Sequence, residues 1–198
     1  MTIEKGRDWG VQGVVGADVR AVDDDRELAC SDGTVVLRGG NLHAALGRPA
    51  PKTAGRDCTL LPVDALRVEV RRTDGSAMVL TAAGEVVVGS WWDRSGLVVV
   101  TNTGHLGTMN ITPRAHPNDG RLDILRMDGS MSLRDRLTAR RRARTGTHLP
   151  HPSLRAESSV ATEVPRSGRQ ALRVDGARIG DWVSVEVTVV PDRFTVAV

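Results

Sequence analysis

Aromatic residues are scarce in this chain of 198 residues: there is no tyrosine and only one phenylalanine. The five aromatic side chains are those of Trp9, Trp91, Trp92, Trp182 and Phe194. The core must therefore consist mainly of Val, Leu, Ile and Ala, a composition that favours β-sheet. The length suits one domain or two small ones, with enough chain to bury a sizeable core.

Cysteine, lysine and long apolar runs are scarce as well. Cys30 and Cys58 are too few and too irregularly spaced for a disulfide framework or a zinc site. No stretch approaches the roughly 20 apolar residues that cross a bilayer, and residues 1–8 lack the apolar run of a signal peptide. We therefore expect a soluble, cytoplasmic protein. Its net charge is only +3, carried largely by arginine.

The first part of the chain, residues 1–56, has the pattern of a short α/β unit. Strands are expected at 17–22 and 34–37. Asp23-Asp24-Asp25 can cap a short helix that ends at Ala29, and Gly39-Gly40-Asn41 leads into a second helix at 42–46. This order favours a parallel sheet, and a Pro-rich linker follows it.

The remainder, residues 57–198, reads mainly as antiparallel strands. The expected strands are 59–71, 78–81, 85–88, 97–101, 121–127, 172–174, 182–190 and 194–198, the last two separated by a Pro191-Asp192 turn. One helix is expected at 132–143, with Ser132 and Asp135 as a partial capping box. The predicted fold class is α+β: an abbreviated α/β lobe, then a mostly antiparallel β-sandwich-like domain with one inserted basic helix.

The most informative motif lies at residues 113–123, where the chain reads Pro-Arg-Ala-His-Pro-Asn-Asp-Gly-Arg-Leu-Asp. This segment resembles the PxAxxxDGxLD signature in the C-terminal domain of the diacylglycerol kinase and YegS-like lipid kinase family. The resemblance covers about residues 57–198 and implies a nucleotide-binding lobe, a β-rich domain and a site in the cleft between them. Residues 1–56 would be a truncated and degenerate version of the nucleotide-binding lobe.

The resemblance implies a magnesium ion in this segment. Asp119 would supply a carboxylate, and His116 and Arg121 would supply backbone carbonyl oxygens, which are the hard ligands that Mg²⁺ prefers. The alternative is a plain Asn-Asp-Gly turn in which Asn118 and Asp119 bond their own backbone.

In the family, a GGDGT loop approaches the phosphates of ATP. Its counterpart here is Gly39-Gly40-Asn41-Leu42-His43, which keeps two glycines at the start of a helix, where an anion can bind. Leu42 replaces a glycine and hinders close approach of a phosphate. Asn41 replaces an aspartate that could organise magnesium. Two interpretations of this segment therefore remain open. Gly39, Gly40 and Asn41 could retain some nucleotide binding, or they could form a plain βα turn.

The resemblance also implies a general base. Active members place a glutamate in a DGE triplet, where it accepts the proton of the lipid hydroxyl. This chain reads Asp175-Gly176-Ala177, so the glutamate position is Ala177. Asp175 is the remaining candidate base, and a hairpin turn is the alternative role of the pair.

Arginines gather on the helix expected at 132–143. Arg140, Arg141 and Arg142 could contact phosphate or anionic lipid, which would bring the protein to a membrane surface, while Leu133 and Leu137 form a narrow apolar stripe. A solvated helix face is the alternative. Nucleic acid is not expected, because no aromatic residues interleave with the arginines. Trp91-Trp92 could pack internally or mark a homodimer contact.

The sequence therefore leaves three hypotheses. The first is a non-catalytic relative, a pseudokinase, that binds a lipid or another phosphorylated small molecule in the inter-lobe cleft. The second is an active ATP-dependent lipid kinase that phosphorylates a lipid hydroxyl. The third is a non-enzymatic interaction or dimerisation module. Ala177, the Leu42-His43 pair and the short first lobe all disfavour the kinase, and with it ATP as a cofactor.

Overall fold

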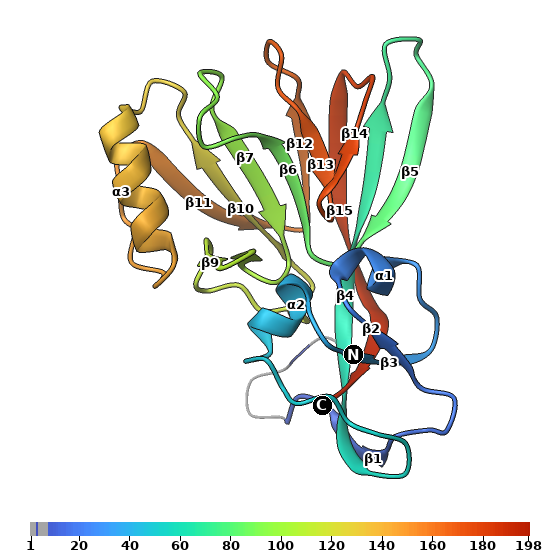
Figure 1. The fold of residues 1–198 in the computed structure, drawn as a ribbon. Coiled ribbons are helices and arrows are strands. Elements are labelled where there is room, and N and C mark those ends of the chain that lie inside the picture. Colours follow the sequence, from blue (N-terminus) through green and yellow to red (C-terminus); the bar gives the residue numbers. More distant parts are fainter. Residues whose placement is uncertain (1–2, 4–7) are drawn as a thin grey trace.

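Two long strands run through both lobes of the molecule and join them (Figure 1). In the computed structural model, which describes residue 3 and residues 8–198, β4 (Asp57–Arg71) pairs antiparallel with β15 (Ser184–Ala197) along most of its length. The upper halves of both strands belong to a β-sandwich, and their lower halves belong to a smaller lobe with two helices (Figure 1). Residues 1–2 and 4–7, where no signal peptide is expected, lie outside the described part.

The lower lobe is built on one end of a seven-stranded mixed sheet, in which five strands follow the order β1-β4-β15-β3-β2. Its short elements are β1 (Val11–Val14), β2 (Arg20–Val22), α1 (Asp25–Ala29), β3 (Thr34–Leu37) and α2 (Gly40–Ala45). As the βαβ pattern predicts, β2 and β3 pair parallel, and β3 also runs parallel to the end of β15. Leu28 of α1 and Leu42 of α2 are fully buried among Val63, Phe194 and Val196 of the sheet.

The upper lobe stacks two sheets. In the first, β5 (Ala77–Ala82) pairs with β4, and β12 (Ala161–Pro165) pairs with β15. The second is antiparallel, in the order β11-β10-β7-β6-β13-β14. Its strands are β6 (Glu85–Gly89), β7 (Leu97–Thr101), β10 (Leu122–Met127), β11 (Leu154–Ser159), β13 (Leu172–Val174) and β14 (Ala177–Ile179). Alternate residues of β4, among them Leu66, Val68 and Val70, are fully buried between the sheets.

The outer face of the second sheet is covered by α3 (Leu133–Ala143) and by a hairpin of β8 (His105–Leu106) and β9 (Met109–Asn110). The Oγ atom of Ser132 accepts a hydrogen bond from the Asp135 amide, so the capping residue predicted from the sequence is confirmed. Ala139 and Ala143 of α3 pack against the same apolar cluster as Met109.

The α+β fold class is confirmed, with three local corrections. The strands predicted at 182–190 and 194–198 are one strand, β15, whose register shifts between Val190 and Phe194. The irregularity is held in place because the Asp192 amide donates to the buried carboxylate of Asp64. Strands β1, β11, β12 and β14 were not predicted, since exposed polar or glycine-rich edge segments have weak alternation. Helix α2 begins at Gly40, two residues before the predicted start.

No helix in the described part of the chain is long and apolar enough to cross a membrane.

Candidate functional site

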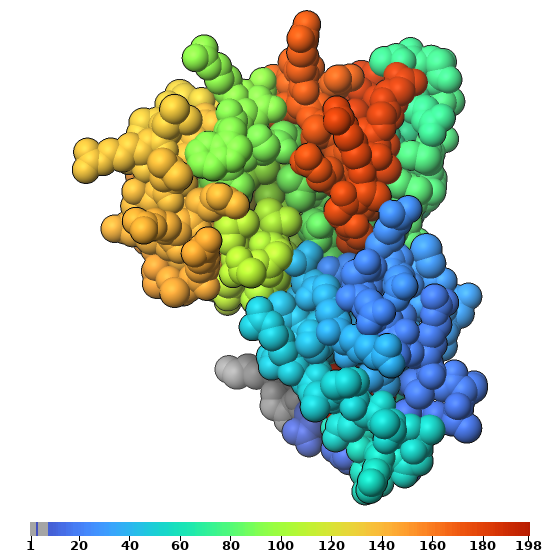
Figure 2. All heavy atoms as spheres, in the orientation of Figure 1, coloured from blue at the N-terminus to red at the C-terminus, as the bar shows by residue number. Residues whose placement is uncertain are grey.

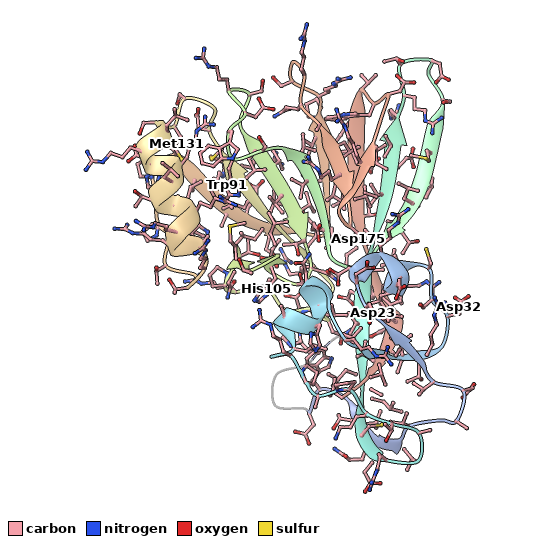
Figure 3. All side chains as sticks on the ribbon, viewed as in Figure 1. Asp23, Asp32, Trp91, His105, Met131 and Asp175 are labelled. Carbon is pink, nitrogen blue, oxygen red and sulfur yellow. The ribbon has the colours of Figure 1, made fainter. Side chains whose placement is uncertain are left out.

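Three carboxylates from different elements meet where the lobes join. Asp25 lies in the first turn of α1, Glu85 begins β6, and Asp175 lies in the turn between β13 and β14. Figure 3 shows Asp175 beside α1 at this junction. Asp25 and Glu85 are buried, and burial is the largest cause of the rise in both pKa values, to which the charge of Asp175 adds.

Asp25 occupies the N-terminus of α2. Its Oδ2 and Oδ1 atoms accept the backbone N–H groups of Asn41 and Leu42, at 2.6 and 3.1 Å. Gly40 has a φ of +92°, and a Cβ on it would lie 2.5 Å from Asp25 Oδ1, so this contact requires glycine. Burial raises the pKa of Asp25 to about 6, although the two backbone hydrogen bonds oppose the rise.

The predicted nucleotide-binding residue Asn41 connects the lobes. Its Nδ2 donates to Glu85 Oε2, and its Oδ1 accepts the Gly107 amide of the β8–β9 hairpin at 2.7 Å. Burial, followed by the charges of Asp175 and Asp25, raises the pKa of Glu85 to about 8. Both functional groups of the Asn41 amide are thus engaged in contacts with the upper lobe.

Asp175, the candidate base, fixes the turn between β5 and β6. Its carboxylate accepts the backbone N–H groups of Ala83, Gly84 and Glu85, at 2.8, 2.9 and 3.0 Å. Burial nevertheless raises the pKa of Asp175. Ala177, at the general-base position of the resemblance, begins β14 and is half-buried.

The loop with the PxAxxxDGxLD pattern is held by Asp64, a fully buried residue of β4. The Asp64 carboxylate accepts Asn118 Nδ2 at 3.0 Å and the Gly120 amide at 2.8 Å. Asp119 does bond its own backbone, since its Oδ1 accepts the Arg121 amide at 3.0 Å. Asn118 instead donates across to β4, so its side chain acts as a long-range tie.

The surroundings of Asp119 suit a hard cation chemically. Asp119 and Asp123 line a cavity of about 830 Å³, and one buried oxygen of Asp123 has no hydrogen-bond partner among the described residues. Burial raises the pKa of Asp119, and raises that of Asp123 to about 6. In the described part of the chain no three His, Cys, Asp or Glu side chains are grouped to hold a metal. The predicted magnesium site differs from such a side-chain cluster, because it consists of the Asp119 carboxylate and the backbone carbonyls of His116 and Arg121. It stays a prediction.

A second, smaller cavity of about 210 Å³ lies between the lobes. We call it the inter-lobe pocket; its walls are Trp9, Ala45, Thr103, His105, Asn110, Thr112, Pro113, Ala115, His116 and Pro117. The Trp9 and His116 rings meet edge to face with centroids 4.5 Å apart, and burial lowers the pKa of His116. Figure 3 shows His105 above α2, on the upper-lobe side of the junction.

The predicted phosphate-contacting residues Arg140, Arg141 and Arg142 are exposed on α3 and do not line the inter-lobe pocket. In Figures 1 and 2, α3 covers the outer side of the upper lobe. The structure therefore brings together Gly39, Gly40, Asn41 and Asp175 at the junction, and separates them from the arginines. The loop at 113–123 lies on another side of the inter-lobe pocket, through Pro113 and His116.

Sequence reasoning missed Asp25 and Glu85. Asp25 was interpreted as part of a capping run, and Asp24 is in fact the residue that caps α1. The available signal was a charged residue, Glu85, at the head of an otherwise apolar strand. A charge in that position requires a buried partner.

Known proteins resemble this chain in fold and in family. The model of the YegS C-terminal NAD kinase beta sandwich-like domain matches residues 62–198. A solved structure from Bacillus anthracis str. Sterne, proposed to be a diacylglycerol kinase, has a TM-score of 0.55 at 12% identity, covering 90% of this chain and 77% of that one. Yeast NADH kinase complexed with NADH also has a TM-score of 0.55 at 12% identity, covering 90% and 60%. No curated protein sequence matches.

The structural likenesses, at such low identity, show a shared fold. The family match covers well over half of the chain and includes the whole 113–123 motif. The family resemblance predicted from that motif is thereby confirmed, chiefly for the C-terminal β domain. The chain belongs to the diacylglycerol kinase and YegS-like family, through its YegS C-terminal NAD kinase beta sandwich-like domain.

Proposed function

We propose that this protein is a non-catalytic member of its family that binds an anionic or lipidic ligand between the two lobes. One observation carries the proposal: the N–H groups of Asn41 and Leu42 donate to the carboxylate of Asp25. These are the groups with which a glycine-rich loop at a helix N-terminus would hold a phosphate. A phosphate there would have to displace the protein's own carboxylate and would meet its negative charge.

The position of the general base supports the same proposal. Ala177 cannot accept a proton, and Asp175 already accepts three backbone N–H groups. Glu85, whose pKa is raised to about 8, is bonded to Asn41. Neither acid lines the inter-lobe pocket or the cavity beside Asp119. In this proposal, Asn41 joins the two lobes through Glu85 and Gly107, and Asp175 fixes the β5–β6 turn beside that contact.

The inter-lobe pocket is the proposed ligand site. At about 210 Å³ it is smaller than the roughly 300–1,000 Å³ typical of drug-sized ligands, so it suits a headgroup rather than a whole nucleotide. Asn110 Oδ1 and Thr112 Oγ1 are buried without a hydrogen-bond partner among the described residues. A hydroxyl of the ligand could donate to them. The Nδ1 atom of His105 donates to the Thr103 carbonyl at 3.0 Å, so the imidazolium form of His105 could donate from Nε2 to a phosphate oxygen.

Magnesium has a structural place in this proposal. Asp119, with the His116 and Arg121 carbonyls, would hold the ion, which would neutralise the acidic loop beside the larger cavity.

Native mass spectrometry of the purified chain tests the ligand. We expect a bound species of small mass, phosphorylated or acylated, that is lost in His105→Leu and kept in the control His151→Leu. His151 lines neither cavity and accepts the Ser153 amide elsewhere. A clean apo mass for the wild-type protein would contradict ligand binding.

Isothermal titration with ATP and Mg²⁺ tests the loss of catalysis. We expect no saturable binding at millimolar nucleotide and no transfer of phosphate to diacylglycerol. Saturable binding with transfer would favour the active kinase instead. An apo mass combined with a dimer in light scattering would favour the interaction module.

A further inference from the structure

Helix α3 buries an arginine and exposes its two leucines. The residues it buries are Arg136, Ala139 and Ala143, which recur at helical spacing along one face. Its two leucines point away from the core, since Leu133 is 64% exposed and Leu137 is 52% exposed. An 11-residue helix that buries an arginine and exposes its leucines has an unpartnered apolar surface.

Arg136 fixes this orientation. Its guanidinium donates to four backbone carbonyl oxygens: Met131 at 2.8 Å, Trp91 at 3.1 Å, Asp93 at 2.8 Å and Gly129 at 2.5 Å. The carbonyls belong to the β6–β7 loop and to the segment between β10 and α3, at one end of the second sheet. Rotating the helix would therefore leave buried polar groups unpaired. The hydrogen bonds of Arg136 therefore keep Leu133 and Leu137 on the outer face of the helix.

The same contacts place Trp92 beside the helix. Trp92 is 50% exposed, and the guanidinium of Arg140 lies 5.9 Å from its ring centroid. Leu133, Leu137, Arg140, Arg141 and Arg144 follow one another at helical spacings on the outer surface, and all are exposed. We call Trp92 together with these five residues the α3 patch; Figure 2 shows the yellow-orange α3 region on the outer side of the upper lobe.

We propose that the α3 patch docks the protein onto an anionic lipid bilayer. Its composition, an aromatic ring and two leucines among arginines, is that of helices that lie in a membrane interface. Apolar side chains enter the acyl boundary there, while basic ones contact the headgroups. The acidic residue of α3, Asp135, accepts the hydroxyl of Ser132 at the helix start. A second copy is a poorer occupant, because symmetric pairing would bring the arginines together.

This inference does not depend on the inter-lobe ligand. The patch lies on the outer side of the upper lobe, and none of its residues lines the inter-lobe pocket. A protein without a ligand in the inter-lobe pocket could still bind vesicles, and a protein that does not bind vesicles could still hold a ligand in that pocket.

Co-sedimentation of the full chain with vesicles tests the proposal. We expect binding to phosphatidylcholine vesicles that contain about one third phosphatidylglycerol, weakened by salt, and little binding to pure phosphatidylcholine. Arg140→Gln with Arg141→Gln should weaken partitioning about fivefold per residue. Leu133→Ser with Leu137→Ser should weaken it about tenfold, since half or more of each side chain would otherwise be buried.

Matched controls lie on other faces of the molecule. Arg173→Gln with Arg178→Gln removes two exposed charges from β13 and β14. Val79→Ser with Val183→Ser removes two apolar side chains that are 54% and 46% exposed. Both control pairs should bind vesicles as the wild-type protein does.

Three outcomes would overturn the proposal. The first is an absence of binding to anionic vesicles, and the second is an equal loss in the patch and control variants. The third is a dimer, seen by light scattering, that the leucine variant dissociates while vesicles bind neither protein. That last result would assign the patch to a second copy.

Discussion

Replacing Glu85 with glutamine should remove a pH-dependent instability at the lobe junction. The pKa of Glu85 is about 8 in the folded protein, against an ordinary value of 4.5. At pH values between about 4.5 and 8, Glu85 holds a proton in the folded protein that it has released in the unfolded chain. The contribution of Glu85 to stability is therefore complete below about pH 4.5 and is lost as the pH rises through about 8.

The size of the effect follows from linkage. One proton changes the free energy of unfolding by about 1.4 kcal/mol per pH unit, or about 4 kcal/mol over three units. The group is only partly titrated at pH 5 in the unfolded chain and at pH 8 in the folded one, so the loss between pH 5 and 8 is roughly 3 kcal/mol. Because Glu85 is only 6% exposed, solvent screens little of this effect. Glutamine has nearly the same shape and can still accept the hydrogen bond from Asn41 Nδ2.

Urea unfolding at a series of pH values measures the difference. We expect the two proteins to be nearly equally stable at pH 5, and Glu85→Gln to be the more stable at pH 8 by about 3 kcal/mol. Glu163→Gln, an exposed change on β12, serves as the control and should follow the wild-type curve. Parallel curves for the wild type and Glu85→Gln from pH 5 to 8 would refute the reasoning.

Three further predictions follow from other contacts. Asp175→Asn should lower the free energy of unfolding by about 2 kcal/mol, because its amide nitrogen replaces one accepting oxygen and leaves either Ala83, or Gly84 and Glu85, without an acceptor; a loss under about 0.5 kcal/mol in urea would contradict this. Arg136→Met should cost about 3 kcal/mol or more, since four carbonyl groups, two of them in buried hydrogen bonds, lose their donor, whereas exposed Arg134→Met should change little. If Asp119 holds Mg²⁺, EDTA should lower the melting temperature of the wild-type protein and leave that of Asp119→Ala unchanged; equal shifts would refute the site.

The sequence specified the strands and the family motif because both depend on neighbouring residues. The alternation of Leu66, Val68 and Val70 with charged residues predicts a sheet with one buried face, and β4 has that form. The motif at 113–123 lies in a continuous segment, so it indicated the family before any contact was known.

The junction could not be predicted because its contacts join residues that are far apart in the chain. Asp25 bonds the Asn41 amide 16 residues on, and Asn41 reaches Glu85 another 44 residues on. Nothing local distinguishes Asp25 from the capping residue Asp24. Only the packing of α1, α2 and β6 decided which carboxylate occupies the helix N-terminus.

Helix α3 shows the same division. Its length and its cap at Ser132 were determined by local sequence. Its orientation was not, because the contacts that set it lie outside the helix. Carbonyl groups of a loop more than 40 residues away bind Arg136 and rotate the leucines outward. Local sequence determined that a helix forms, and the need to pair buried polar groups decided which face meets the solvent.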